Sequence, residues 1–149
     1  QRIVTMYKRI TIYNKKIYIY GNDFSTPDGT CIRDYIHIND ICSAIEKSTN
    51  YLLSNKKSVI FNIGSHKGLS NNEIVNYIKK TIKNKIDLSY VKRRKGDVSR
   101  LICDSNQIYK TLNWRAKNSH LKKIITNEIL WIKKFKKKGL NRTFKNYLK

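Results

Sequence analysis

Acidic residues, proline and long apolar segments are scarce in this sequence. Its 149 residues contain 10 Asp and Glu against 32 Lys and Arg, which gives a formal net charge of +22. No apolar run approaches the ~20 residues that a membrane-crossing helix needs, so we expect no membrane partner. The three cysteines, Cys31, Cys42 and Cys103, form no C-x-x-C pair. This spacing argues against a zinc site or a disulfide framework and favours reduced thiols in the cytoplasm.

The excess of positive charge has two interpretations. A basic surface is typical of proteins that bind nucleic acids, with tyrosines as platforms for stacked bases. The basic residues are, however, spread over the whole chain and accompanied by abundant Ile, Asn and Tyr. Codons for Lys, Asn, Ile and Tyr are rich in A and T, so a compositional drift of the genome explains the charge equally well. We therefore predict no specific binding of nucleic acid and keep a basic nucleic-acid-binding module as an alternative.

Apolar periodicity and capping residues predict alternating helices and strands, which is typical of a small α/β layer. Ser70 and Glu73 have the spacing of a capping box, in which each side chain bonds to the other residue's backbone N–H. Asn39, Ser105 and Ser119 are the predicted caps of further helices. The predicted helices cover residues 2–11, 39–55, 105–112 and stretches that begin at 70 and 119, and the predicted strands cover residues 17–20, 58–63 and 87–91.

The stretch from Gly21 to His37 has the most specialised residue order in the chain. It opens with Gly-Asn-Asp, contains the only proline, continues through Asp28-Gly29-Thr30 and ends in Arg-Asp-Tyr-Ile-His. So many turn-forming residues predict a shaped loop rather than a periodic element. A long loop that ends in an Arg beside an aromatic residue suits a small anionic ligand. An ordinary surface loop is the plainer interpretation of the same residues.

A second specialised stretch, from Tyr90 to Asp97, places two adjacent arginines ahead of a Gly-Asp turn. Together with Tyr18-Ile19-Tyr20, these stretches resemble the carboxyl-terminal part of the UDP-glucose 4-epimerase family of extended short-chain dehydrogenases/reductases. The resemblance covers roughly residues 16 to 131, and T-P-D-G-T, R-D-Y-I-H, F-N-I-G, R-R-x-G-D and L-N-W occur in the family order. It implies an NAD-dependent isomerase of galactose metabolism that interconverts UDP-glucose and UDP-galactose.

The resemblance also implies which residues bind the substrate. Arg33 and Arg94 are assigned to the diphosphate, where two parallel N–H donors fix a geometry that a lysine cannot. Asp97 is assigned to the ribose hydroxyls. Lys95 and Gly96, in the same loop, are also assigned to substrate binding, with Lys95 using its backbone.

The remaining assignments concern the uracil and the sugar. Tyr18-Ile19-Tyr20 is assigned to the uracil, and alternation places its two tyrosines on one face of a strand. Because adjacent residues on a strand face opposite sides, Arg93 is predicted to point away from the pocket that contains Arg94. Leu101 falls where the family limits the space around the second carbon of the sugar, which leaves acceptance of N-acetylated sugars open.

The catalytic and cofactor-binding motifs of the family are not in this sequence. In the family, a Tyr-x-x-x-Lys pair takes the proton from the 4-hydroxyl of the sugar, while NAD, held on a Gly-rich turn, accepts the hydride. No Tyr here is followed four positions later by Lys, and the six glycines form no such turn. The resemblance therefore implies that a missing Rossmann half binds NAD. It also implies that this chain supplies no catalytic residue and is inactive alone.

We expect one mixed-sheet α/β substrate domain over residues 1–135 and a basic tail over residues 136–149. Gln1 leads directly into a helical pattern with no leader, which favours a piece of a longer cytoplasmic protein. The expected partners are a UDP-sugar, the missing Rossmann half and, for the whole enzyme, a second copy in a homodimer. Part of another nucleotide-sugar dehydratase or decarboxylase, and a gene remnant that does not fold alone, stay open as alternatives.

Overall fold

Two small sheets organise the protein. The computed structural model describes residues 16–82 and 86–137, so the helix predicted over residues 2–11 lies outside the described residues, as does most of the predicted tail. One sheet pairs two parallel strands, and the other places a central strand between an antiparallel and a parallel neighbour. This arrangement confirms the predicted mixed-sheet α/β class. The first sheet contains β1 (Ile17–Tyr20) and β4 (Leu88–Val91), and the second contains β3 (Gly68–Ser70), β2 (Ile32–Asp34) and β5 (Arg100–Leu101) in that order.

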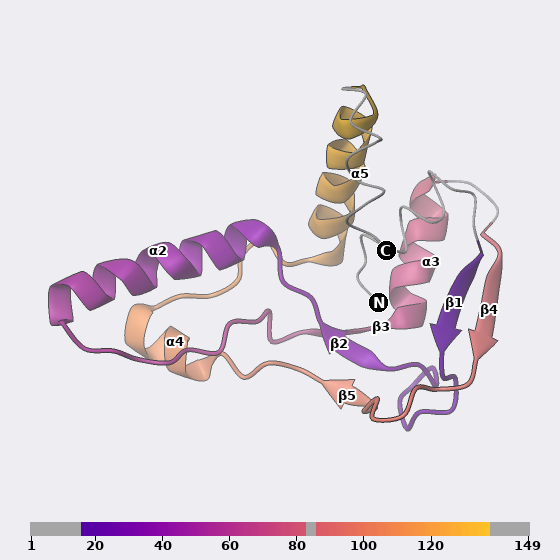
Figure 1. Ribbon diagram of the computed structural model, residues 1–149, viewed down its shortest axis with the longest axis horizontal. Coiled ribbons are helices and arrows are strands. Elements are labelled where there is room, and N and C mark those ends of the chain that lie inside the picture. Colours follow the sequence, from indigo (N-terminus) through magenta and orange to yellow (C-terminus); the bar gives the residue numbers. More distant parts are fainter. Residues whose placement is uncertain (1–15, 83–85, 138–149) are drawn as a thin grey trace.

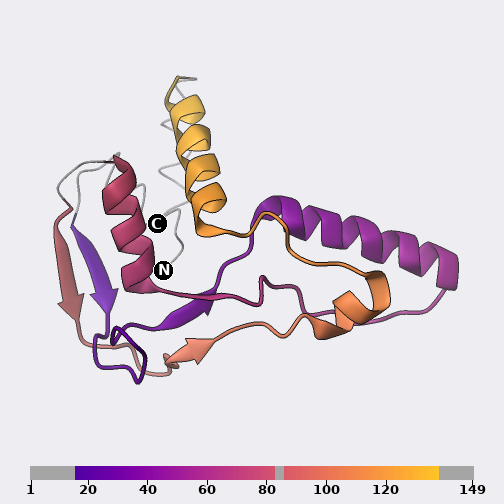
Figure 2. The same cartoon turned by 180° about the vertical axis from the view of Figure 1, so that it is seen from behind.

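The helices form two groups, one beside the first sheet and one that projects away from it (Figure 1). Near the β1–β4 pair stand α3 (Asn71–Ile82) and α5 (Leu121–Lys137), whereas α2 (Ile38–Asn55) projects away from it with α4 (Asn106–Leu112) beneath. The view from behind shows the same arrangement (Figure 2). The described chain is therefore elongated, with a packed end around β1 and β4 and an arm formed by α2 and α4. No described helix, from residue 16 to 82 or from 86 to 137, has the length and apolar character of a membrane span.

The packed end contains the larger apolar core. Ile17 and Ile19 of β1 are at most 1% exposed, and they cluster with the fully buried Ile74 and Ile78 of α3 and with isoleucines of α5. Alternation along β1 turns its isoleucines inward and its tyrosines outward, as a period of two requires. A smaller core in the arm joins α2 to α4 through buried Ala44, Ile108 and Trp114.

The start of α3 has the predicted capping box. The Ser70 N–H donates to Glu73 Oε2 over 2.6 Å, and the Glu73 N–H donates to Ser70 Oγ over 3.0 Å. Two of the N–H groups that a helix start leaves unpaired are thereby satisfied. The Ser70 hydroxyl also donates to Asp28 Oδ2, so the same residue ties the T-P-D-G-T loop to α3.

Two other predicted caps, Asn39 and Ser105, do not make the predicted hydrogen bond to the start of their helix. The cap of α2 is His37 rather than Asn39, because His37 Nδ1 accepts from the Asn39 N–H at 3.0 Å. Ser105 does precede α4, but its side chain makes no cap bond there. Its hydroxyl donates to the Gly64 carbonyl at 3.1 Å instead. In both cases a distant segment or an unexpected neighbour takes the place of the local partner that the sequence suggests.

The predicted strand over residues 58–63 is also wrong. The segment is irregular in the structure, and Ile60 is 87% exposed. High strand propensity describes how well a residue fits a pleated, half-buried surface, and it takes effect only when a neighbouring strand supplies the surface and the hydrogen bonds. Among the described residues, no strand pairs with this segment.

A buried carboxylate, Asp40, joins the first turn of α2 to the segment that leads into α5. Its oxygens accept from the backbone N–H groups of Lys117 at 3.1 Å and Asn118 at 2.8 Å, and from the hydroxyl of Ser119. The hydroxyl of Ser119, which was predicted to cap a helix, therefore donates its hydrogen bond to Asp40. Burial alone raises the pKa of Asp40, but the hydrogen bonds from Ser119 and Asn118 outweigh it and lower the pKa below 3.8.

Asp40→Ala should lower the free energy of unfolding by roughly 2–4 kcal/mol, because it leaves several buried donors without an acceptor. Urea denaturation of the purified chain measures this loss. Asp87→Ala is the control, because the Asp87 side chain is 69% exposed and, among the described residues, forms one ion pair, with Lys16 at 3.6 Å. Such surface pairs contribute about 0–1 kcal/mol. Equal losses for the two variants would contradict the anchoring role of Asp40.

The same anchor predicts a pH dependence. Because the folded state lowers the pKa of Asp40, its contribution is complete above the unfolded-state pKa of 3.8 and is lost as the pH falls through the folded-state value. The difference in stability between the wild type and Asp40→Asn should therefore narrow as the pH falls from about 5 to about 2. A difference that stays constant over this range would show that the ionised carboxylate is not the source of the stabilisation.

Candidate functional site

Two loops run together from the first sheet to the second. Residues 21–31 connect β1 to β2, and residues 92–99 connect β4 to β5 (Figures 1 and 2). At one end the Gly21 N–H donates to the Val91 carbonyl at 2.8 Å, and at the other the Ile32 N–H donates to the Ser99 carbonyl at 2.8 Å. A side chain at Gly21 would lie 2.9 Å from Arg93 Cβ, so glycine permits this close approach. The two specialised stretches of the sequence are thus neighbours in space.

The adjacent arginines of the second loop contact different partners. The Arg94 guanidinium lies 3.8 Å from the centre of the Tyr20 ring. Arg93 instead forms an ion pair with Asp23 at 3.6 Å and lies 5.7 Å from the Phe24 ring. The predicted reason for this separation is wrong, because β4 ends at residue 91 and both arginines lie beyond the strand. Irregular backbone separates the two side chains, not alternation along a strand.

Arg33 and Asp97, predicted to bind different parts of a ligand, contact each other. Arg33 Nη2 lies 3.7 Å from Asp97 Oδ1, and Arg33 Nη1 donates to the carbonyls of Ile32 and Val98 at 2.8 Å. Asp97 belongs to a turn in which its N–H donates to the Arg94 carbonyl at 3.2 Å. The short stretch from Arg94 to Asp97 therefore connects Tyr20 on one sheet with Arg33 on the other.

The other predicted residues differ in their accessibility. Tyr18 is 36% exposed, whereas Ile19 is 1% exposed and belongs to the core. The side chain of Ile19 is therefore not available to a ligand, although its backbone is part of the β1 edge. Lys95 and Gly96 are exposed at the tip of the turn. Gly96 has φ +87, a backbone conformation that favours glycine, and an added side chain there would meet nothing within 4 Å.

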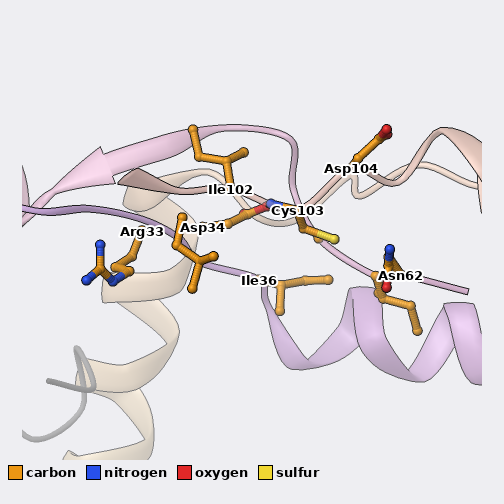
Figure 3. Close-up of a pocket in the computed structure, with 10 residues that line it drawn as sticks. Arg33, Asp34, Ile36, Asn62, Ile102, Cys103 and Asp104 are labelled. Atoms are coloured by element: carbon orange, nitrogen blue, oxygen red, sulfur yellow. The ribbon is translucent and has the colours of Figure 1, made fainter. Parts of the chain in front are cut away.

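A cleft of about 420 Å³ opens beside Arg33. Figure 3 shows Arg33 near one end of the cleft, and Asn62 and Asp104 near the other. Its walls come from β2 and β5 and from the segment that ends at Gly64. Of the residues that the sequence assigns to the substrate, Arg33 and Leu101 line this cleft, whereas Tyr18, Tyr20, Arg94 and Asp97 do not. The lining includes Arg33, Asp34, Asn62, Leu101, Cys103 and Asp104.

The floor of this cleft is held by Asp34, which sequence reasoning missed as a site residue. Asp34 accepts from the backbone N–H groups of Ser65 at 3.0 Å, His66 at 3.2 Å and Cys103 at 3.2 Å. Gly64 lies against Asp34 and Cys103 so closely that an added side chain would collide with both. Each partner is distant in sequence from Asp34, so only its place beside Arg33 in R-D-Y-I-H signals its importance.

Described groups near the site offer little acid–base or metal chemistry. Burial, followed by the charge interaction with Cys31, raises the pKa of Tyr35 to about 12, despite an opposing effect of Arg33. Its hydroxyl therefore stays protonated at neutral pH. His37 is buried and bonded through both ring nitrogens, to the Asn39 N–H and to Asn127 Nδ2 at 2.9 Å. In residues 16–82 and 86–137, no three His, Cys, Asp or Glu side chains gather as metal ligands. The groups that these loops do present are the guanidinium groups of Arg33 and Arg94, which have the N–H donors to pair with an anion.

Known proteins share both the sequence and the fold. The family model of GDP-mannose 4,6-dehydratase matches residues 1–127. A UDP-glucose 4-epimerase of Streptococcus mutans is 38% identical over 117 residues, which are 78% of this chain and 35% of that protein. A crystal structure of a UDP-glucose 4-epimerase has a TM-score of 0.84 and 31% identity, and covers 90% of this chain and 41% of that one.

A third comparison adds ligands. The UDP-glucose 4-epimerase of Bifidobacterium longum, solved in complex with NAD+ and UDP, has a TM-score of 0.77 and 25% identity. It covers 90% of this chain and 39% of that one. The 149-residue chain thus spans about a third of the length of the curated relative from Streptococcus mutans. The similarity is strong but concerns one part of those proteins.

Gly64→Ala should lower the free energy of unfolding by roughly 1–3 kcal/mol, because the new methyl group has no space between Asp34 and Cys103. Thermal and urea denaturation measure the loss. Asn62→Ala is the control, since Asn62 lines the same cleft but is exposed, and such substitutions usually change stability by less than about 0.5 kcal/mol. A Gly64→Ala variant as stable as Asn62→Ala would show that Asp34 and Cys103 can shift to accommodate the methyl group without loss of stability.

Proposed function

The chain belongs to the GDP-mannose 4,6-dehydratase family of extended short-chain dehydrogenases/reductases, and we propose that it forms the UDP-sugar-binding part of a UDP-glucose 4-epimerase. The whole enzyme would interconvert UDP-glucose and UDP-galactose in galactose metabolism. The part represented by these 149 residues would hold the nucleotide, within the proposed domain of residues 1–135. Residues 136–149 would form a basic tail outside it.

One observation carries the proposal. The turn from Arg94 to Asp97 begins at the arginine stacked on Tyr20 and ends at the carboxylate paired with Arg33. Two guanidinium groups distant in sequence, one on β2 and one on the loop after β4, are thereby linked by one short stretch of chain. Lys92, Arg93 and Lys95 add positive charge to the same loop. Two guanidinium groups, each with parallel N–H donors, fit the two phosphates of a nucleoside diphosphate.

Each group of the nucleotide has a matching residue. We assign the diphosphate to Arg33 and Arg94, and the ribose hydroxyls to Asp97, whose side chain is 34% exposed. Phosphate oxygens would then replace Asp97 beside Arg33 Nη2, and ribose hydroxyls would replace Arg33 beside Asp97. The uracil would lie along the Tyr18–Tyr20 edge of β1, with backbone groups around Ile19 facing the base. Lys95 would contribute through its backbone, and Gly96 would allow the turn.

The hexose would enter the cleft beside Arg33. An epimerase must let a 4-keto sugar present both of its faces to one cofactor, so the nucleotide is held firmly and the hexose loosely. Leu101 lines this cleft and is 62% exposed, so it offers an apolar wall without hydrogen bonds to the sugar. This residue would limit the space around the second carbon of the hexose.

The hydride chemistry belongs to a part of the fold that these 149 residues do not contain. NAD, present in the solved Bifidobacterium longum relative, accepts and returns the hydride when bound. The sequence has neither the Gly-rich turn nor the Tyr-x-x-x-Lys pair, so none of its residues is assigned to NAD or to proton transfer. We propose a Rossmann half as partner, a homodimer for the whole enzyme, and the cytoplasm as its location.

Arg94→Lys should weaken the binding of UDP by roughly 1.5–3 kcal/mol, because the charge remains but the paired N–H donors are lost. Arg93→Lys is the matched control, since Arg93 contacts Asp23 and should change the affinity far less. Titration calorimetry measures both, on the chain completed with a cofactor-binding half. Equal losses would mean that only local positive charge matters. A larger loss for Arg93→Lys would mean that the wrong arginine is placed in the site, and tighter binding of GDP than of UDP would favour a dehydratase.

The isolated chain should not bind NAD measurably or interconvert UDP-glucose and UDP-galactose, because the residues for both tasks are absent from its sequence. A coupled turnover assay with added NAD checks this. The completed enzyme serves as the positive control. Clear turnover by the 149 residues alone would contradict the division of labour proposed above.

A further inference from the structure

A second cavity lies in the arm, beside α4 (Figure 1). It is lined by residues from 64–67, 105–109 and 114–116, and we call it the arm cavity. Its volume of about 440 Å³ is within the range of about 300–1,000 Å³ that is usual for small-molecule sites. Among the described residues it shares Gly64 alone with the cleft beside Arg33. The arm cavity is therefore separate from the site assigned to the nucleotide.

One wall of the arm cavity is held in place by His66. Its backbone has φ +62, a conformation that few residues other than glycine adopt. The ring joins this turn to the start of α4, because Nε2 accepts from the Ser105 N–H at 3.2 Å and lies 3.3 Å from Asp104 Oδ1. The His66 N–H also donates to Asp34 Oδ2 at 3.2 Å. The wall is thus formed before any ligand binds, which lowers the cost of binding.

The arm cavity is rich in hydrogen-bond donors. Because His66 Nε2 accepts a hydrogen bond, the proton of the neutral ring lies on Nδ1, which has no acceptor among the described residues. None of the described residues that line the cavity is Asp or Glu. The adjacent Asp104 already accepts from the Asn106 N–H at 2.9 Å. An anion would therefore meet unpaired donors and no carboxylate in the lining.

A stacked arginine distinguishes the arm cavity from the basic surface in general. The Arg115 guanidinium lies 3.9 Å from the centre of the Tyr109 ring. Stacking occupies one face of the guanidinium and leaves the N–H groups in its plane available to an acceptor. In the part of the chain that the structure describes, neither Arg115 nor Lys67 forms an ion pair. The cavity thus contains a positioned guanidinium and a lysine, both without an acidic partner.

We propose that the arm cavity binds a small phosphate ester, with Lys67 and Arg115 as the charged partners of the phosphate and His66 Nδ1–H as a neutral donor. A phosphate monoester carries a charge of about −1.5 to −2 at pH 7 and has three strong acceptor oxygens, which matches these three donor groups. Tyr109 and Ala116 offer an apolar wall for the organic part of the ester. None of these residues is assigned to UDP, so the site is additional to the proposed function.

A nucleic acid strand fits the arm cavity less well. Proteins that bind single strands combine a groove that follows several phosphates with aromatic faces on which bases stack. Here the Tyr109 ring already stacks with Arg115, and Trp114 is 3% exposed. A single enclosed phosphate therefore suits the cavity better than a continuous backbone.

Nuclear magnetic resonance locates the site residue by residue. Phenyl phosphate is titrated into the isolated chain and into the chain completed with a cofactor-binding half, at about 0.15 M NaCl to screen diffuse attraction. Amides in 64–67 and 105–116 should shift along one saturable curve in both samples, and saturating UDP should not reverse it. Shifts confined to residues 21–31 and 92–99, or shifts that UDP abolishes, would overturn the proposal. Binding of phenyl phosphate in the arm cavity without any binding of UDP would instead remove the proposed function.

Matched variants test which charges matter. Lys67→Gln should weaken the binding of phenyl phosphate at least about tenfold, and so should Arg115→Lys, which keeps the charge but loses the planar donors. Lys110→Gln is the control, because Lys110 is exposed on α4 outside the cavity lining, and it should change the affinity less than about twofold. Equal losses for Lys67→Gln and Lys110→Gln would overturn the proposal. So would a single-stranded oligonucleotide that binds more tightly than phenyl phosphate and is weakened by the same variants.

Discussion

Three carboxylates hold the described chain together. Asp28, Asp34 and Asp40 follow one another at six-residue intervals, and each accepts hydrogen bonds from a different distant segment. Asp28 accepts from Ser70 at the start of α3, Asp34 accepts around the turn at Ser65, and Asp40 accepts from the segment before α5. Burial alone would raise the pKa of Asp28, as it would that of Asp40. The hydrogen bonds from Ser70 and Thr30 have the larger combined effect, and they lower the pKa of Asp28 below 3.8. One stretch of chain thus fixes the positions of two helices and a turn.

The same constraint positions the candidate site. Arg33 lies on β2 between the Asp28 and Asp34 anchors, and its strand is paired on both edges. The turn that begins at Arg94 is brought to it by the parallel pairing of β1 with β4. Rigid elements therefore set the distance between the two loops, while the residues that would bind the nucleotide remain at their exposed ends. Such a division suits a site that must hold one part of a substrate firmly and let another part turn.

Local signals were sufficient for much of this fold. The Ser70–Glu73 cap and the strand at residues 17–20 depend on near neighbours in sequence, and the structure confirms them. The misses depend on distant partners. Ser105 gives its hydroxyl to Gly64, and residues 58–63 have no strand to pair with. The contact between Arg33 and Asp97 was equally hidden, because no local pattern reports that two loops meet.

The central claim is that this chain carries the nucleotide-binding residues of a larger enzyme, and a crystal structure with UDP bound tests it most directly. The account predicts the diphosphate between the guanidinium groups of Arg33 and Arg94, the ribose at Asp97 and the uracil along the edge of β1. UDP bound elsewhere, or held by Arg93 while Arg94 remains stacked on Tyr20, would contradict it.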